Sequence, residues 1–72
     1  MAAPLSYRGI ADDIQRRIDA GEYPPGSALP SYRDLARAYG VSVSTTQRAL
    51  GLLHDRGSIT GVPGRGIYVT GR

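Results

Sequence analysis

The sequence predicts a small, mainly helical α+β domain, in which three helices precede a two-stranded antiparallel β-hairpin. This architecture is a winged helix-turn-helix. Three observations predict it. Apolar residues recur at helical spacing in three stretches, and each stretch follows a serine that can cap a helix. Gly40 separates the second stretch from the third by a tight turn. Two β-prone runs, 58–62 and 67–70, flank the glycine-rich segment 63–66, which is the candidate wing.

The length of 72 residues allows one domain, and we expect residues 1–72 to form it. So short a chain has little room for both a core and an enclosed catalytic cleft. It has no cysteine and one histidine, so we expect no disulfide, no metal site and no cofactor. No apolar run approaches the roughly 18 residues that cross a membrane. Residues 1–5 lack the features of a signal peptide, so we expect a cytoplasmic location.

The first helix is expected over residues 6–20, with Ser6 as its N-cap and Gly21 at its end. Its apolar positions at helical spacing are Tyr7, Ile10, Ile14 and Ile18. The neighbours Asp12 and Asp13 point about 100° apart on a helix, so they cannot converge on one substrate. We interpret them as part of a solvated face.

The second helix is expected to open at Ser31, after a turn and a short extended segment, 27–29, that we expect at a sheet edge. Asp34 lies three residues after Ser31, which is the spacing of a capping box with Asp in place of the usual Glu. Gly40 is expected to end this helix in a left-handed conformation.

The third helix is expected over about 43–56, capped by Ser42 and ended by Gly57. Its core-facing positions are Thr46, Ala49, Leu50 and Leu53. The opposite face holds Ser44, Arg48, Gly51 and Asp55. A glycine inside an exposed helix is unfavourable, and the sequence offers no account of Gly51. We interpret His54 as a surface residue.

The charge is uneven along the chain. Residues 1–30 carry a net charge of −1 and residues 31–72 carry +4. The positive charge thus lies with the helix-turn-helix and the wing, as a surface that faces phosphates requires. All nine basic residues are arginine, which suits bidentate contacts to phosphate and guanine, although a preference for arginine codons would also produce this pattern.

Double-stranded DNA is therefore the expected partner, with the third helix in the major groove. The first turns of that helix offer base edges and phosphates a set of short polar, apolar and basic side chains. The candidates are Val43, Ser44, Thr45, Gln47 and Arg48. Gln can read adenine, Arg can read guanine or hold phosphate, and Val can touch a thymine methyl group. The alternative is an ordinary solvated helix face.

Two further segments hold candidate DNA contacts. At the start of the second helix they are Ser31, Tyr32 and Arg33, where Tyr32 either lies against sugar–phosphate or covers the helix end. In the wing they are Gly64, Arg65 and Gly66, because glycines permit close approach and an arginine at the tip can enter a narrow minor groove. An exposed hairpin with an ordinary arginine is the alternative.

The order and spacing of these residues resemble the N-terminal DNA-binding domain of the GntR family of bacterial transcription regulators. The resemblance covers residues 5–70 and is carried by Pro25-Gly26, Leu29-Pro30-Ser31, Gly40-Val41-Ser42, Ala49-Leu50 and Gly64-Arg65-Gly66. It implies a winged helix-turn-helix that binds a near-palindromic operator as a pair, usually to repress. It also implies that Arg33, Ser44, Thr45 and Gly64 occupy positions that contact DNA.

Three positions depart from the family pattern, because Tyr32 replaces a usual Glu and both Val43 and Gln47 replace a usual Arg. We therefore expect a different base preference, with Gln47 and Arg48 reading more of the sequence. The short aromatic wing looks most like the branch named for the histidine-utilisation repressor. Family members also carry an effector-binding and dimerising domain that this sequence lacks, so we expect no small-molecule effector site in it. It is either an excised domain or a minimal regulator.

Two other functions remain open from the residues. One is an architectural or excision accessory protein of a phage or plasmid, which would bend DNA and need no promoter. The other is a winged-helix module that binds protein. We expect no enzyme activity, because the sequence shows no nucleophile–base pair, metal cluster or phosphate-binding loop.

Overall fold

The computed structural model describes residues 6–62 and 64–70 of the chain. Three helices precede a hairpin: α1 (Tyr7–Asp19), α2 (Tyr32–Tyr39), α3 (Val43–Asp55), β1 (Ile59–Val62) and β2 (Gly66–Val69). These bounds lie within one residue of those expected from the sequence, and the predicted fold class is confirmed. Pro63 of the expected wing loop lies outside the described residues, as do residues 1–5 and 71–72.

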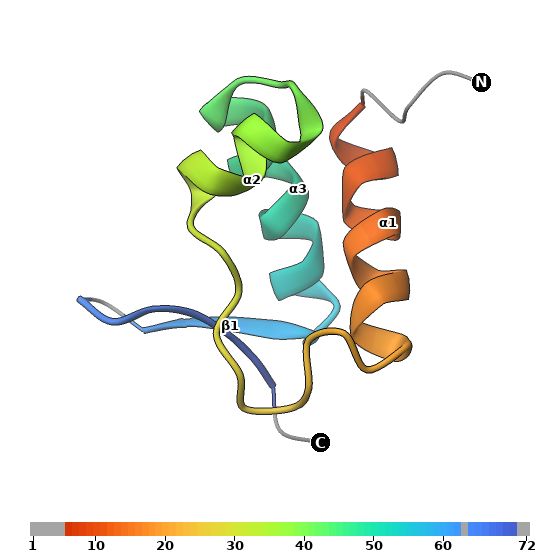
Figure 1. Ribbon diagram of the computed structural model, residues 1–72, viewed down its shortest axis with the longest axis vertical. Coiled ribbons are helices and arrows are strands. Elements are labelled where there is room, and N and C mark those ends of the chain that lie inside the picture. The colour runs from red at the N-terminus through yellow and green to blue at the C-terminus, as the bar shows by residue number, and fades with distance from the viewer. Residues whose placement is uncertain (1–5, 63, 71–72) are drawn as a thin grey trace.

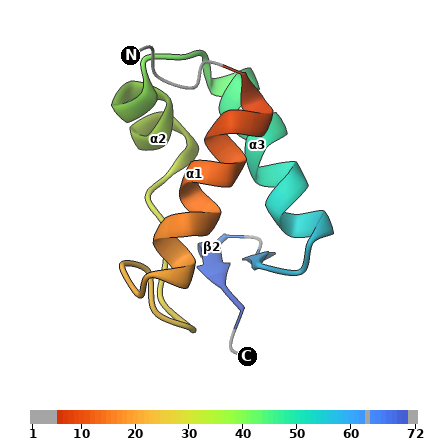
Figure 2. The same ribbon diagram turned by 90° about the vertical axis from the view of Figure 1, so that its right-hand side faces the viewer.

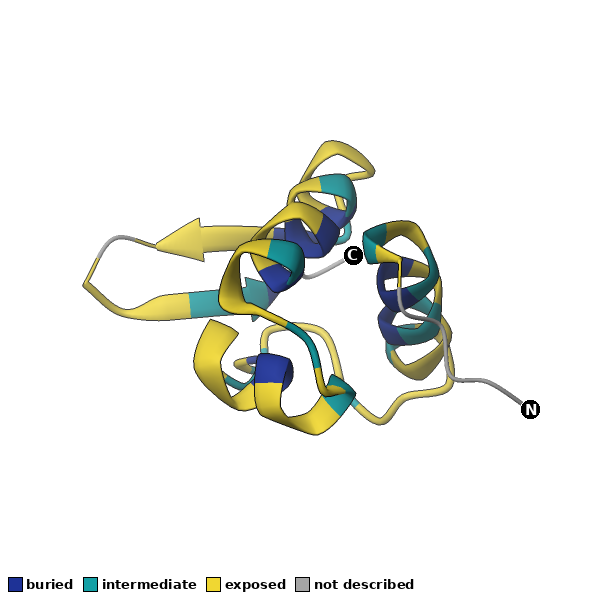
Figure 3. Cartoon of the chain, turned by 90° about the horizontal axis from the view of Figure 1, so that it is seen from above, coloured by how far each residue is buried: buried dark blue, intermediate teal, exposed yellow. Residues whose placement is uncertain are grey.

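The three helices pack around a small apolar core. Figure 1 shows α1 and α3 side by side with α2 next to α3, and Figure 2 shows the same three helices from the side. The buried faces of all three helices turn inward (Figure 3). The core cluster consists of Ile10, Ala11, Ile14, Leu29, Leu35, Ala49, Leu50, Leu53, Ile59 and Val69. Burial of these side chains is the main stabilising term for so short a chain.

Each helix begins at a serine whose hydroxyl accepts a backbone hydrogen bond. Ser6 accepts from Gly9, Ser31 from Asp34 and Ser42 from Thr45, each at 3.1 Å. The expected capping box at Ser31 is half formed. In the described structure the Asp34 carboxylate makes no return bond to the Ser31 backbone, since an aspartate is one methylene shorter than the glutamate of that motif.

Gly40 makes the turn that joins α2 to α3. It adopts the left-handed conformation expected from the sequence, with φ 69° and ψ 35°. The backbone N–H of Val41 then donates to the carbonyl of Ala36 at 3.0 Å, which gives a hydrogen-bond partner to a carbonyl group at the C-terminal end of α2. Val41 packs against the core, so the turn fixes the orientation of α3 relative to α2.

The wing is an antiparallel hairpin in which Ile59 pairs with Val69 and Val62 with Gly66. Segment 27–29 lies along the other edge of β2, where Ala28 bridges to Tyr68 and the Leu29 N–H donates to the Ile67 carbonyl at 2.8 Å. The expected extended segment is thus present. It ties the hairpin to the helices, while the tip projects away from them (Figure 1).

The expectation for Asp13 was wrong. Its side chain is 15% exposed rather than solvated, and it accepts a 2.6 Å hydrogen bond from the Tyr39 hydroxyl of α2. Arg16 and Arg17, one turn further along α1, also bond to this carboxylate. Tyr39 reaches it because α2 packs its last turn near α1, which is a tertiary placement that helical periodicity does not reveal.

This contact shifts both ionisations. The hydrogen bond from Tyr39 lowers the pKa of the Asp13 carboxyl below 3.8, although partial burial opposes the shift. Burial and the same hydrogen bond raise the pKa of Tyr39 to about 12. The carboxylate therefore stays ionised and the phenol stays protonated at neutral pH, and together they link α1 to α2.

Candidate nucleic-acid interface

The first turn of α3 presents a cluster of hydroxyl groups. The Ser42 hydroxyl donates to the Thr45 hydroxyl at 3.0 Å and lies 3.3 Å from that of Ser44. Ser44 and Val43 are exposed, and Val43 is 40% exposed although it is apolar. Thr46, by contrast, is fully buried and donates to the Ser42 carbonyl at 3.2 Å. The Thr46 hydroxyl therefore lies in the core, whereas the hydroxyl groups of Ser42, Ser44 and Thr45 lie at the N-terminal end of α3.

Gln47 and Arg48 leave α3 on different sides. Gln47 lines a hollow between α3 and the wing. The guanidinium carbon of Arg48 lies 5.4 Å from the centre of the Tyr7 ring on α1, which is a cation–π contact. The sequence grouped these two residues as base readers, and the structure separates them.

The start of α2 carries three more candidates. The Ser31 hydroxyl is occupied by its capping bond to the Asp34 N–H. Arg33 is exposed in the first turn. Tyr32 is 38% exposed, and it lines the hollow beside Gln47 as well as a second hollow along the wing.

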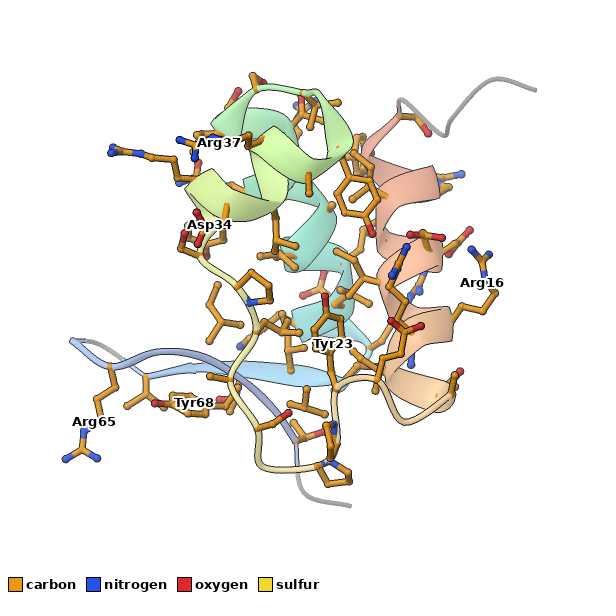
Figure 4. The ribbon with its side chains drawn as sticks, viewed as in Figure 1. Arg16, Tyr23, Asp34, Arg37, Arg65 and Tyr68 are labelled. Carbon is orange, nitrogen blue, oxygen red and sulfur yellow. The ribbon has the colours of Figure 1, made fainter. Side chains whose placement is uncertain are left out.

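The wing tip is built from residues that leave its backbone open. Gly64 and Gly66 have φ values of 77° and 122°, a region that favours glycine. The Arg65 N–H donates to the Val62 carbonyl at 2.9 Å and closes the turn. Figure 4 shows the Arg65 side chain pointing away from the body of the molecule, on the side opposite Arg16 of α1.

A groove that was not predicted from the sequence runs between α3 and the wing. One hollow of about 290 Å³ lies between the two elements, and a second of about 400 Å³ continues it along the hairpin. They share Tyr32, Gly61 and Ile67, and we call them together the α3–wing groove. Gly51 and His54 line its α3 side.

The structure brings four of the eleven candidates together at one groove. Tyr32, Gln47, Gly64 and Gly66 all line the α3–wing groove. Arg48 lies beside α1 instead. Within the described residues, no group of three or more potential ligand side chains forms a metal site, and no helix is long and apolar enough to cross a membrane.

The family model described as bacterial regulatory proteins of the GntR family matches residues 6–69. Among curated proteins, the chain is 41% identical over 63 residues to the mannosyl-D-glycerate transport/metabolism system repressor MngR of Escherichia coli. It is 34% identical over 67 residues to the transcriptional repressor NagR of Bacillus subtilis. These matches cover 88% and 93% of the chain but 26% and 27% of the two relatives, so the chain spans about a quarter of their length.

Solved structures agree with this assignment. A GntR family transcriptional regulator from Listeria monocytogenes matches with a TM-score of 0.88 at 36% identity, over 92% of this chain and 58% of that one. The DNA-binding domain of AraR in complex with operator ORR3 matches with a TM-score of 0.85 at 27% identity, over 97% and 93%. The chain belongs to the GntR family of bacterial regulatory proteins, and its fold is the winged-helix DNA-binding domain of that family.

Proposed function

We propose that this chain binds operator DNA for a bacterial transcription regulator, with the first turns of α3 in the major groove and the wing tip at the neighbouring minor groove. The observation that carries the proposal is the exposed hydroxyl-bearing end of α3, which follows the Gly40 turn, together with a wing that projects from the helices (Figure 1). The AraR domain of similar structure is described as an operator complex, which supports the same mode here.

The candidate residues take different roles. The residues that contact base edges are Val43, Ser44, Thr45 and Gln47. The first three lie at the end of α3 that enters the major groove of the DNA, and Gln47 lies on the side of α3 that lines the α3–wing groove. Arg33 contacts the DNA next to α2. The Ser31 hydroxyl is occupied as the cap of α2. The contact of this segment with DNA is therefore made by the protein backbone near Ser31.

Arg48 takes the role of a phosphate contact in this proposal, in place of the base reading expected from the sequence. Its guanidinium is held over Tyr7, beside α1, while base edges are met by the end of α3. Phosphate contacts fix position and carry no sequence information directly. In the wing, Arg65 enters the minor groove and the glycines on either side let the backbone approach.

Repression is the regulatory role we propose, because both MngR and NagR are named repressors. The operator in this proposal is palindromic and is bound by a homodimer, because other helix-turn-helix proteins bind as dimers to two half-sites about one helical turn apart. Such a regulator acts in the bacterial cytoplasm, at the nucleoid. No enzyme activity and no small-molecule effector site are part of this proposal.

A comparison of two variants tests the assigned roles. Gln47→Ala is expected to relax selectivity at one base pair, with a loss of about 1–3 kcal/mol on the preferred duplex. Arg48→Ala is expected to weaken binding to preferred and scrambled duplexes alike, and to lower the salt slope by about 1. Fluorescence anisotropy titrations at several salt concentrations measure both. Loss of selectivity in Arg48→Ala with none in Gln47→Ala would reverse the assignment.

A further inference from the structure

Gly51 has no structural reason to be glycine in the described part of the molecule. It lies inside α3 and is exposed. A Cβ atom built there meets no other atom within 4 Å, so neither close packing nor a backbone contact excludes a side chain. Its backbone is helical, without the positive φ found at Gly40. Because glycine destabilises a helix relative to alanine, its presence points to something that approaches from outside.

The position of Gly51 identifies the side of that approach. It lines the α3–wing groove next to Tyr32, Gln47 and His54. Gln47 lies one turn before Gly51 and Ser44 lies two turns before it, so all three share one face of α3. This is the face that the proposed function turns toward DNA.

The wing side of the groove also carries glycines. Gly61, Gly64 and Gly66 line it along the hairpin, and a Cβ atom built at any of the three meets nothing within 4 Å. Glycines therefore lie on both sides of the groove, among the side chains of Leu50, His54, Val62 and Ile67, with the exposed ring of Tyr32 at the α2 end.

A duplex held by both elements must place a strand in this groove. The major and minor grooves of a duplex are separated by a sugar–phosphate strand. If α3 occupies one groove and the wing occupies its neighbour, that strand passes between them. In the proposed mode this strand lies in the α3–wing groove. We infer that Gly51 provides the clearance that lets the strand reach the backbone of α3. The inference rests on the proposed function.

The charges around the groove are consistent with this path. Arg33 follows Tyr32 in the sequence and Arg65 stands between two of the wing glycines, so both arginines are neighbours of residues that line the groove. The groove also contains one carboxylate, that of Asp55 at the last residue of α3. The phosphates therefore pass nearer Tyr32 and Gln47 than the C-terminal end of α3, where repulsion would be greatest.

Substitutions at Gly51 test the inference, with Ala38→Gln as the matched control. Ala38 is exposed on α2 and does not line the groove. Gly51→Gln adds bulk without charge, and Gly51→Glu adds the same bulk with a negative charge. Affinity for labelled duplexes is measured by anisotropy, and thermal unfolding shows that each variant is folded. Gly51→Ala is expected to unfold at a higher temperature than the wild type.

If the groove holds a phosphate strand, Gly51→Gln should lose about tenfold in DNA affinity and Gly51→Glu should lose more. Ala38→Gln should keep an affinity within about twofold of the wild type. The losses should be equal on preferred and scrambled duplexes, because a backbone contact carries no sequence information. Wild-type affinity in both Gly51 variants would overturn the inference while leaving DNA binding intact. A wild-type chain that shows no salt-dependent DNA binding would overturn the proposed function as well.

Discussion

At the scale of single residues, the most informative contact is the one between Asp13 and Tyr39. It joins α1 to α2 across 26 positions of sequence, and it is charge-assisted because the carboxylate is ionised. Arg16 and Arg17 hold the same carboxylate from one turn away, so the carboxylate has partners on both helices. The position of α2 against α1 depends on this cluster as well as on the apolar core.

Removing the Tyr39 hydroxyl should lower stability without disturbing the core. Tyr39→Phe is expected to reduce the free energy of unfolding by about 1 kcal/mol, because the Asp13 carboxylate loses a hydrogen-bond donor. Urea unfolding followed by circular dichroism measures the change. Tyr68→Phe is the control, since that hydroxyl makes a single long contact of 3.4 Å to the Arg65 carbonyl. Equal losses in the two variants would contradict the role given to Asp13.

The same pair predicts a dependence of stability on pH at both extremes. The lowered pKa of Asp13 contributes stability above its unfolded value of 3.8, and this is lost as pH falls through the folded value. The raised pKa of Tyr39 contributes stability below 10, and this is lost as pH rises from 10 to about 12. In both of these pH ranges, the urea midpoint of the wild type should therefore fall toward the urea midpoint of Tyr39→Phe. A constant difference across the whole range would contradict the assignment.

At the scale of the elements, serine caps determine where the helices begin. The cap of α3 matters most for function, because it sets the turn at which the hydroxyl cluster is presented. Its hydroxyl serves three partners, namely the Thr45 N–H, the Thr45 hydroxyl and the Ser44 hydroxyl. Order at this end of α3 is thus coupled to the stability of the helix.

Loss of the α3 cap should destabilise the domain more than loss of a neighbouring hydroxyl. Ser42→Ala is expected to reduce the free energy of unfolding by about 1 kcal/mol, the usual cost of removing a serine N-cap. Ser44→Ala, on the exposed first turn, should change it by less than about 0.5 kcal/mol. Thermal or urea unfolding of the two variants provides the comparison. A larger loss in Ser44→Ala would show that the cap is not the source of order here.

The elements were predictable because their signals are local. A serine, a run of apolar residues at helical spacing and a glycine such as Gly40 fix each helix within its own stretch of sequence. The placement of Arg48 over Tyr7 and of Asp13 beside Tyr39 was missed, since each depends on how two helices pack. The α3–wing groove was missed for the same reason, although the unexplained Gly51 was its one local trace.

At the scale of the whole molecule, charge and shape act together. The half of the sequence with a net charge of +4 contains α2, α3 and the wing, and the half with −1 contains α1. The wing reaches outward from the helices, with the α3–wing groove between them. In the proposed mode, one copy of so small a surface would make few phosphate contacts, so we expect a single domain to bind weakly and a pair on two half-sites to bind more tightly.

The most direct test of the central claim is selection of bound duplexes from a random pool, at two salt concentrations. We predict enrichment of a common half-site, repeated in inverted orientation about one helical turn apart, with weaker binding at the higher salt. Binding that weakens with salt but enriches no sequence would contradict sequence-specific regulation and favour an architectural role. Absence of binding at both salt concentrations would contradict the assignment of this surface to DNA.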